Sequence, residues 1–108
     1  MDTKEILCAA SYYKRSYYLN EDIAPLPDKI KEELRTVTVC LAEKAKSIVT
    51  IGFYKDNGEL FVQAQSDAED LLYDDINARV EINKGEKENK EFFSSLSLWY
   101  KTFVLKKV

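Results

Sequence analysis

Residues 47–65 read SIVTIGFYKDNGELFVQAQ, and this stretch decides the fold more than any other part of the chain. Two runs rich in alternating apolar residues, 47–55 and 59–65, flank Asp56-Asn57-Gly58. Asn-Gly is the pair that best tolerates the positive φ angles of a type I′ turn, so the pattern predicts a β-hairpin. A two-residue turn would pair Phe53 with Val62 and Ile51 with Ala64 on one face, and Tyr54 with Phe61 on the other.

The segment before this hairpin, residues 36–41, has the alternation and the β-branched residues typical of a strand. Residues 43–46 would then form a turn, and the three strands would form an antiparallel meander. A continuous helix is the competing interpretation, because helical spacing also relates Ile30, Leu34, Val37 and Leu41.

The N-terminal segment carries a helix capping box at Asp2 and Glu5, which predicts a helix over residues 2–18. Its tyrosines are also typical of a strand. Residues 20–27 contain turn formers and two prolines, so we expect a loop there and a short helix over 27–35. The apolar face of the first helix would carry Ile6, Ala10, Tyr13 and Tyr17.

Two helices are expected after the hairpin. The first begins at the capping-box pair Ser66 and Glu69 and ends near Gly85. The polar run 83–90 contains the turn to the last helix. The expected core positions are Ala68, Leu72, Ile76 and Val80 in the first helix, and Phe92, Leu96, Trp99 and Phe103 in the last.

The last helix has a second apolar row beside its core stripe, formed by Phe93, Tyr100 and Val104. This apolar face is wider than a single packing contact needs. The second row is therefore either fully enclosed, or it forms an interaction surface for a partner protein or for a second copy in a homodimer.

The 108 residues suit a single domain, 1–108, whose apolar content is sufficient for one core. We expect an α+β fold in which a small antiparallel meander of two or three strands packs against several helices. The net charge of −3 and the scattered basic residues make nucleic acid an unlikely partner.

Histidine is absent from the chain, which removes the most common side chain for acid–base catalysis and for zinc binding. No phosphate-binding loop or nucleophile motif is present either. We therefore predict no catalytic residue and no cofactor, and expect a small protein-interaction or regulatory module.

Cys8 and Cys40 do not have metal-ligand spacing, so both are predicted to be small buried side chains in a reducing compartment. No stretch resembles a signal peptide or reaches membrane-spanning length. These features predict a cytoplasmic location and no membrane partner.

The densest acidic cluster consists of Asp67, Glu69, Asp70, Asp74 and Asp75. On a helix, Asp67, Asp70 and Asp74 would share one face, and carboxylate oxygens are the ligands that magnesium and calcium prefer. A divalent-metal-dependent enzyme is thus an alternative hypothesis. The favoured interpretation is a solvated helix start, with Asp75 paired to Arg79.

Residues 12–18 interleave four tyrosines with Lys14 and Arg15, a combination found in proteins that bind single-stranded nucleic acid. Weak single-strand binding is therefore a second alternative. A structural role is favoured, because two cations make a small electrostatic footprint and tyrosines often line the edge of a core.

Four segments together resemble a small bacterial family of domains of unknown function found in Gram-positive anaerobes, namely residues 17–22, 26–27, 70–76 and 95–101. The resemblance covers nearly the whole chain. It implies no known activity, cofactor or binding residue.

Overall fold

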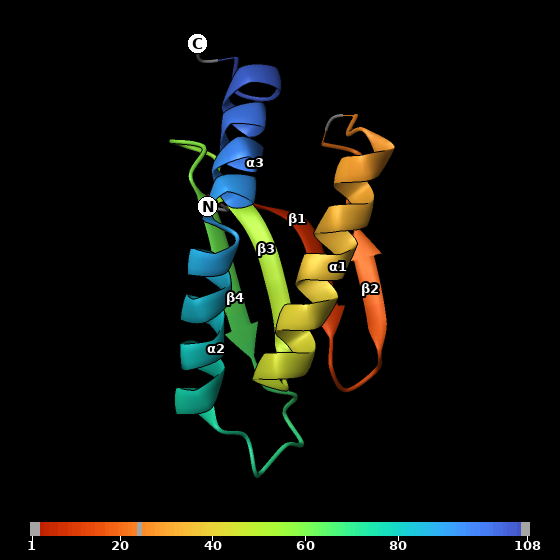
Figure 1. The fold of residues 1–108 in the computed structure, drawn as a ribbon, viewed down its shortest axis with the longest axis vertical. Helices are drawn as coiled ribbons and strands as arrows, with labels where there is room; N and C mark the ends of the chain where they lie inside the picture. The colour runs from red at the N-terminus through yellow and green to blue at the C-terminus, as the bar shows by residue number, and fades with distance from the viewer. Residues whose placement is uncertain (1–2, 24, 107–108) are drawn as a thin grey trace.

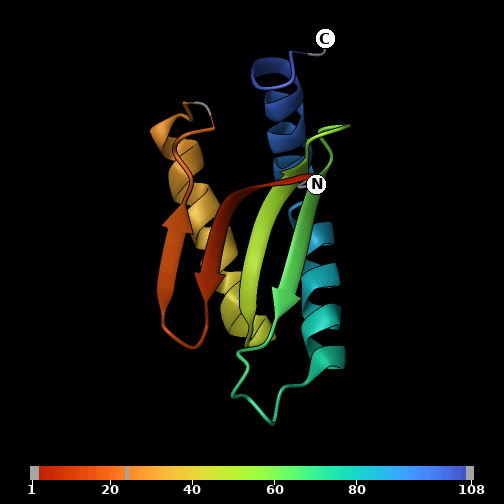
Figure 2. The same ribbon diagram turned by 180° about the vertical axis from the view of Figure 1, so that it is seen from behind.

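The computed structural model describes residues 3–23 and 25–106 and has an α+β fold. Along the chain its elements are β1 (Lys4–Ser11), β2 (Ser16–Leu19), α1 (Asp28–Ala45), β3 (Ile48–Tyr54), β4 (Leu60–Gln65), α2 (Asp75–Glu88) and α3 (Lys90–Phe103). The strands form an antiparallel sheet in the order β2-β1-β3-β4. Helices α1, α2 and α3 lie on one face of this sheet, and no described element covers the other (Figure 1, Figure 2).

The core lies between the sheet and the helices. Alternate residues of β1 and β3 point toward it, because successive side chains of a strand face opposite ways. The helices supply the other half. Its larger side chains are Leu7, Val49, Ile51 and Phe53 from the sheet and Leu34, Leu41, Ile82, Phe93, Leu96 and Tyr100 from the helices.

The predicted hairpin at residues 47–65 is confirmed, but its register differs from the prediction by two residues. Ile51 pairs with Val62, and Phe53 pairs with Leu60. The connection is longer than a two-residue turn, since the Gly58 N–H donates to the Tyr54 carbonyl oxygen at 2.7 Å. A shift of two residues keeps each side chain on its face of the sheet, so the expected apolar face still points to the core.

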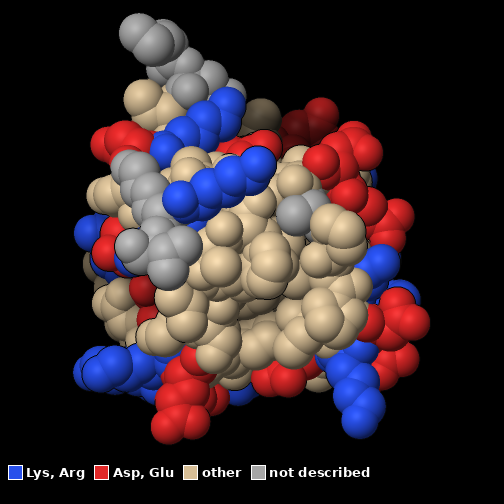
Figure 3. Space-filling model, turned by 90° about the horizontal axis from the view of Figure 1, so that it is seen from above, with Lys and Arg blue, Asp and Glu red and all other residues tan. Residues whose placement is uncertain are grey.

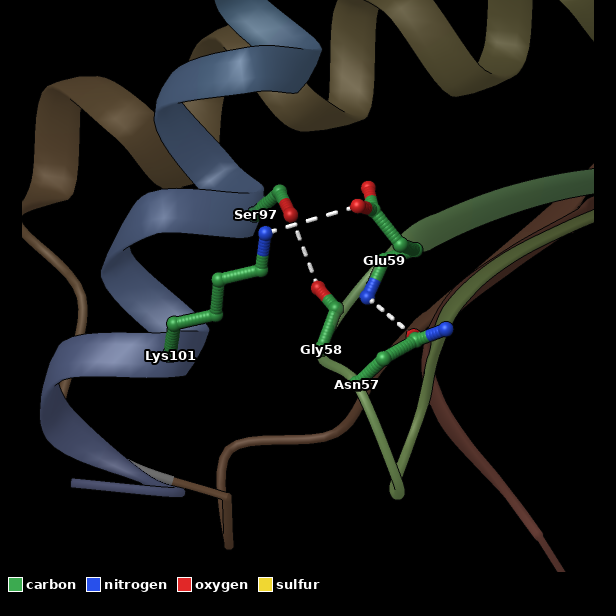
Figure 4. Close-up of polar contacts among 5 residues, drawn as sticks. All are labelled: Asn57, Gly58, Glu59, Ser97 and Lys101. Atoms are coloured by element: carbon green, nitrogen blue, oxygen red, sulfur yellow. Dashed lines mark hydrogen bonds and ion pairs between the residues drawn. The ribbon is translucent and has the colours of Figure 1, made fainter. Parts of the chain in front are cut away.

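The hairpin loop is held against α3 (Figure 4). The buried Ser97 hydroxyl donates to the Gly58 carbonyl oxygen at 2.7 Å. Lys101 Nζ lies 3.5 Å from Glu59 Oε1, and Asn57 Oδ1 accepts the Glu59 N–H at 2.9 Å. The Ser97 bond stabilises the contact more than the exposed ion pair does, because solvent weakens the latter.

The prediction of an N-terminal helix over residues 2–18 is wrong for the described residues. The strand alternative is confirmed for Tyr17 and Tyr18, whereas Tyr12 and Tyr13 lie in the turn between β1 and β2. Residues 4–19 form the β1–β2 hairpin, and Asp2 lies outside the described residues. Arg15 closes the turn with a φ of 52°. Because β1 pairs with β2 on one side and β3 on the other, sheet pairing overrides the local helical spacing.

The predicted strand at residues 36–41 is also wrong, and α1 runs without interruption from Asp28 to Ala45. The competing helical interpretation is therefore the correct one. Thr38 does not disturb the helix, because its hydroxyl donates to the Leu34 carbonyl oxygen at 2.6 Å. Helix α1 packs over β1 and β3. The strands that join β3 and β4 in the sheet are β1 and β2 of the N-terminal hairpin, and not residues 36–41.

Helix α2 begins at Asp75, nine residues after the predicted start at Ser66. Its N-cap is Asp74, whose side chain accepts the Asn77 N–H. It buries Ala78, Ile82 and Gly85, so the predicted core face was the wrong one. A Cβ at position 85 would clash with Leu41 Cδ2. Gly85 therefore allows α1 and α2 to approach closely and is not part of a turn. The predicted core residues Leu72, Ile76 and Val80 are exposed.

Helix α2 ends at Glu88 and α3 begins at Lys90, so Asn89 forms the turn between them, and the prediction that the run 83–90 contains this turn is confirmed. Of the four predicted core positions only Leu96 is fully buried. Trp99 and Phe92 are half-buried, and Phe103 is 65% exposed. The buried face is rotated by about one residue, and it carries Phe93, Leu96, Ser97 and Tyr100.

Candidate functional site

Asp67, Asp70 and Asp74 of the acidic cluster lie before α2, whose first residue is Asp75, so these three carboxylates do not share a helical face. Each candidate ligand accepts a nearby backbone N–H. Asp67 accepts from Glu69 at 3.0 Å, Asp70 from Leu72 at 3.0 Å and Asp74 from Asn77 at 2.9 Å. Within residues 3–23 and 25–106, no group of three or more His, Cys, Asp or Glu side chains is placed to hold a metal ion. The geometry gives the metal-enzyme hypothesis no support.

Asp70 also joins the acidic loop to the β1–β2 hairpin. Its Oδ2 accepts the Tyr13 hydroxyl at 2.6 Å. Loss of solvent around the phenol, followed by this bond to a carboxylate, raises the pKa of Tyr13 to about 12. Asp70 therefore has a structural role that its position in the sequence did not reveal.

The two cysteines have different environments. Cys8 is fully buried, as predicted, with its Sγ 3.4 Å from Thr38 Oγ1. Burial raises the pKa of the Cys8 thiol to about 11, so the thiol stays neutral and is a poor nucleophile near neutral pH. Cys40 is exposed on α1, and the prediction that it is buried is wrong.

Two of the three residues in the second apolar row of the last helix are enclosed, so these two are not available to a partner in this fold. Phe93 and Tyr100 are buried, and Val104 is half-buried against the core. The Tyr100 ring stacks on Phe53 with centroids 4.2 Å apart and an interplanar angle of 10°. Phe93 and Tyr100 thus follow the enclosed alternative, and Val104 remains partly exposed.

The tyrosine-rich segment at residues 12–18 does not form one surface. The Tyr13 hydroxyl binds Asp70, and Tyr18 lies on the uncovered face of the sheet, opposite to its neighbour Tyr17. Only part of the segment, including Arg15, lines a groove beside α1. This dispersal weakens the single-strand hypothesis, which needs successive rings on one platform.

The groove lies between the β1–β2 hairpin and α1 and has a volume of about 610 Å³. Two guanidinium groups lie over tyrosine rings there. Arg35 Cζ is 5.9 Å from the Tyr17 ring centroid, and Arg15 Cζ is 5.1 Å from that of Tyr12. The sequence did not link Arg15 to Arg35. The two arginines are 20 residues apart, and only the fold brings their elements together.

Four aliphatic residues before and within α2 are exposed, and we call them the exposed aliphatic segment. Leu71 and Leu72 are both 93% exposed, Ile76 is 79% exposed and Val80 is 44% exposed. Ile76 and Val80 are one turn apart on the side of α2 opposite to its buried residues. Adjacent exposed aliphatic side chains of this size are typical of a surface that another molecule covers.

A further uncharged surface lies at the end of the molecule that carries the start of α1 and the last turns of α3 (Figure 3). Charged side chains surround it in this view. Ile30 and Trp99 are half-buried against the core from α1 and α3. These residues complete the core, so the exposed aliphatic segment is the clearer candidate for an interface.

A protein-family model described as "Family of unknown function (DUF6145)" matches residues 4–108. The chain belongs to this family. The predicted resemblance to a family of unknown function is thereby confirmed. Neither the curated proteins nor the solved structures provide a match, and no helix within the described residues is long and apolar enough to cross a membrane.

Proposed function

We propose that this DUF6145 domain is a non-catalytic protein-interaction module that acts in the cytoplasm and forms a homodimer through the exposed aliphatic segment. The observation that carries the proposal is the exposure of Leu71, Leu72, Ile76 and Val80. Covering them removes apolar surface from water, which stabilises the covered state by about 25 cal/mol for each Å² buried.

The distribution of charge around the segment favours a second copy as the occupant. Acidic residues flank Leu71 and Leu72 and continue to Asp75 at the start of α2, and the exposed cations Lys84 and Lys87 follow Ile76 and Val80 along the helix. Two copies packed antiparallel about a two-fold axis would bring the acidic loop of each toward the basic part of the other. The surface is thus complementary to itself in both charge and hydrophobicity.

Co-purification of two differently tagged copies, expressed together, tests the proposal. The wild-type copy should retain its partner, and Ile76→Glu should abolish retention because it buries an unpaired carboxylate at the interface. Leu98→Glu is the matched control, since Leu98 is 65% exposed on α3 and outside the segment.

Two results would contradict the proposal. Equal loss of retention in Ile76→Glu and Leu98→Glu would place the contact elsewhere or show a general effect of charge. Failure of the wild-type copies to associate would reject the homodimer.

A further inference from the structure

Strand β2 has one unpaired edge. It pairs only with β1 among the described strands, and no element lies beyond it in either ribbon view (Figure 1, Figure 2). The Asn20 N–H, just after β2, donates toward β1, to the Leu7 carbonyl oxygen at 2.8 Å. Because backbone groups alternate between the two edges of an antiparallel strand, the N–H and C=O groups of Tyr17 and Leu19 face the open edge.

The groove described above lies beside this edge, on the helix side of the sheet. Helix α1 packs over β1 and β3 and leaves the side chains of β2 at its flank. The Tyr17 ring and residues of α1 line the groove. A strand added to β2 would therefore place every second side chain against α1.

The charge in this groove favours an acidic occupant. Its charged lining residues are Arg15, Arg35 and Glu43, an excess of one positive charge on a chain whose net charge is −3. Arg35 makes no ion pair with a carboxylate in the described part of the chain. A guanidinium that lies over an aromatic ring keeps its in-plane N–H donors available for a carboxylate.

Arg15 provides a second contact that a ligand can take over. Its Nη1 is 3.5 Å from Glu43 Oε1, and the two side chains are 67% and 56% exposed. Such an exposed pair contributes little to stability. Arg15 also has a φ of 52°, an uncommon backbone conformation for a residue other than glycine, at the turn that carries it over the groove.

We propose that an extended acidic peptide segment of a partner protein binds here as a fifth strand on β2. The outward backbone groups of Tyr17 and Leu19 form main-chain hydrogen bonds with the peptide, and its carboxylates pair with Arg35 and Arg15. The site shares no residue with the exposed aliphatic segment, so either proposal can fail without the other.

The test uses the full chain and an end-capped eight-residue peptide of alternating glutamate and valine, with a lysine–valine peptide as its charge-reversed control. Amide hydrogen exchange should slow at Tyr17 and Leu19 when the acidic peptide is present, and not with the basic peptide. Arg35→Gln should weaken binding about tenfold, the effect of losing one charge-assisted hydrogen bond. Arg79→Gln, an exposed arginine of α2, changes the net charge equally and should leave binding unchanged.

Several outcomes would overturn the proposal. Absence of binding to the acidic peptide at low salt would do so, as would equal weakening by the two arginine variants. Protection of β4 amides in place of those of β2 would assign the contact to the other edge of the sheet. Equal binding of free glutamate, without protection at Tyr17 and Leu19, would identify a site for small anions. Protection at these amides in the protein alone would identify pairing between two copies.

Discussion

The Tyr100 hydroxyl of α3 donates to Glu5 Oε1 of β1 at 2.7 Å, which links residues 95 positions apart in the chain. The same tyrosine stacks on Phe53 and is 1% exposed. Tyr17 presents a contrasting case, because its hydroxyl is buried beside the Cys8 thiol, which is a weak hydrogen-bonding group. Burial raises the pKa of both phenols. The two residues therefore allow the same substitution to be made in two contrasting environments.

Replacing each tyrosine by phenylalanine should have different effects on stability. Tyr100→Phe loses a hydrogen bond to a carboxylate and should lower the free energy of unfolding by about 1–2 kcal/mol. Tyr17→Phe removes a buried hydroxyl that has only the weakly bonding Cys8 thiol beside it, and should leave the stability unchanged or raise it by about 1 kcal/mol. Urea denaturation measures both changes, and equal destabilisation by the two variants would show that the Tyr17 hydroxyl makes a hydrogen bond as strong as that of Tyr100.

The contact between α3 and the hairpin loop should depend on Ser97. Ser97→Ala leaves the Gly58 carbonyl oxygen without its donor and should cost about 1–2 kcal/mol. Ser95→Ala is the matched control on the same helix, because the exposed Ser95 hydroxyl only donates to the Glu91 carbonyl oxygen within the helix. Thermal or urea unfolding of the two variants should differ by most of this amount. Identical midpoints would contradict a stabilising role for the loop contact.

Stability should decrease at alkaline pH through Cys8. Burial holds the pKa of the folded thiol at about 11, against an ordinary value of 9.0. The unfolded chain therefore loses this proton first as the pH rises, so the stabilising contribution is complete below about pH 9 and is lost by about pH 11.

Cys8→Ser isolates this effect from the tyrosines, because serine does not ionise in this range. Urea unfolding from pH 8 to 11 should show a shallower decline for Cys8→Ser than for the wild-type chain. Parallel declines would mean that other groups cause the alkaline loss.

The β3–β4 hairpin was predictable because its signal is local. The Asn57-Gly58 pair and the alternating residues on both sides lie within 20 residues of sequence. The register was wrong by two because it depends on the conformation of the loop, which is anchored to α3 through Ser97. That contact spans 39 residues and has no signature in the sequence of the hairpin.

The helical faces and the N-terminal strands were harder to predict, for a different reason. Helical spacing is consistent with either of two buried faces on α2, one with Ile76 and one with Ala78 and Ile82. The larger apolar residues favoured the face with Ile76, which is exposed in the structure. The β1 strand has helical spacing too, but it becomes the central partner of β2 and β3. The choice between these patterns depends on long-range packing, which a single sequence does not display.

The candidate interface illustrates the same point. The large residues at positions 72, 76 and 80 were assigned to the core because they recur at helical spacing. Their exposure emerged only when the fold placed Ala78, Ile82 and Gly85 on the buried side of α2. The residues that sequence analysis placed in the core thus became the candidate interface, and Phe93 and Tyr100 became part of the core.

Sedimentation equilibrium of the untagged protein tests the central proposal most directly. With rising concentration the wild-type chain and Leu98→Glu should approach twice the 12.5 kDa chain mass, and Ile76→Glu should remain at the monomer mass. Circular dichroism would establish that Ile76→Glu is folded, as expected for a residue that is 79% exposed. A wild-type chain that stays monomeric up to millimolar concentration, or a folded Ile76→Glu variant that dimerises as the wild type does, would contradict association through the exposed aliphatic segment.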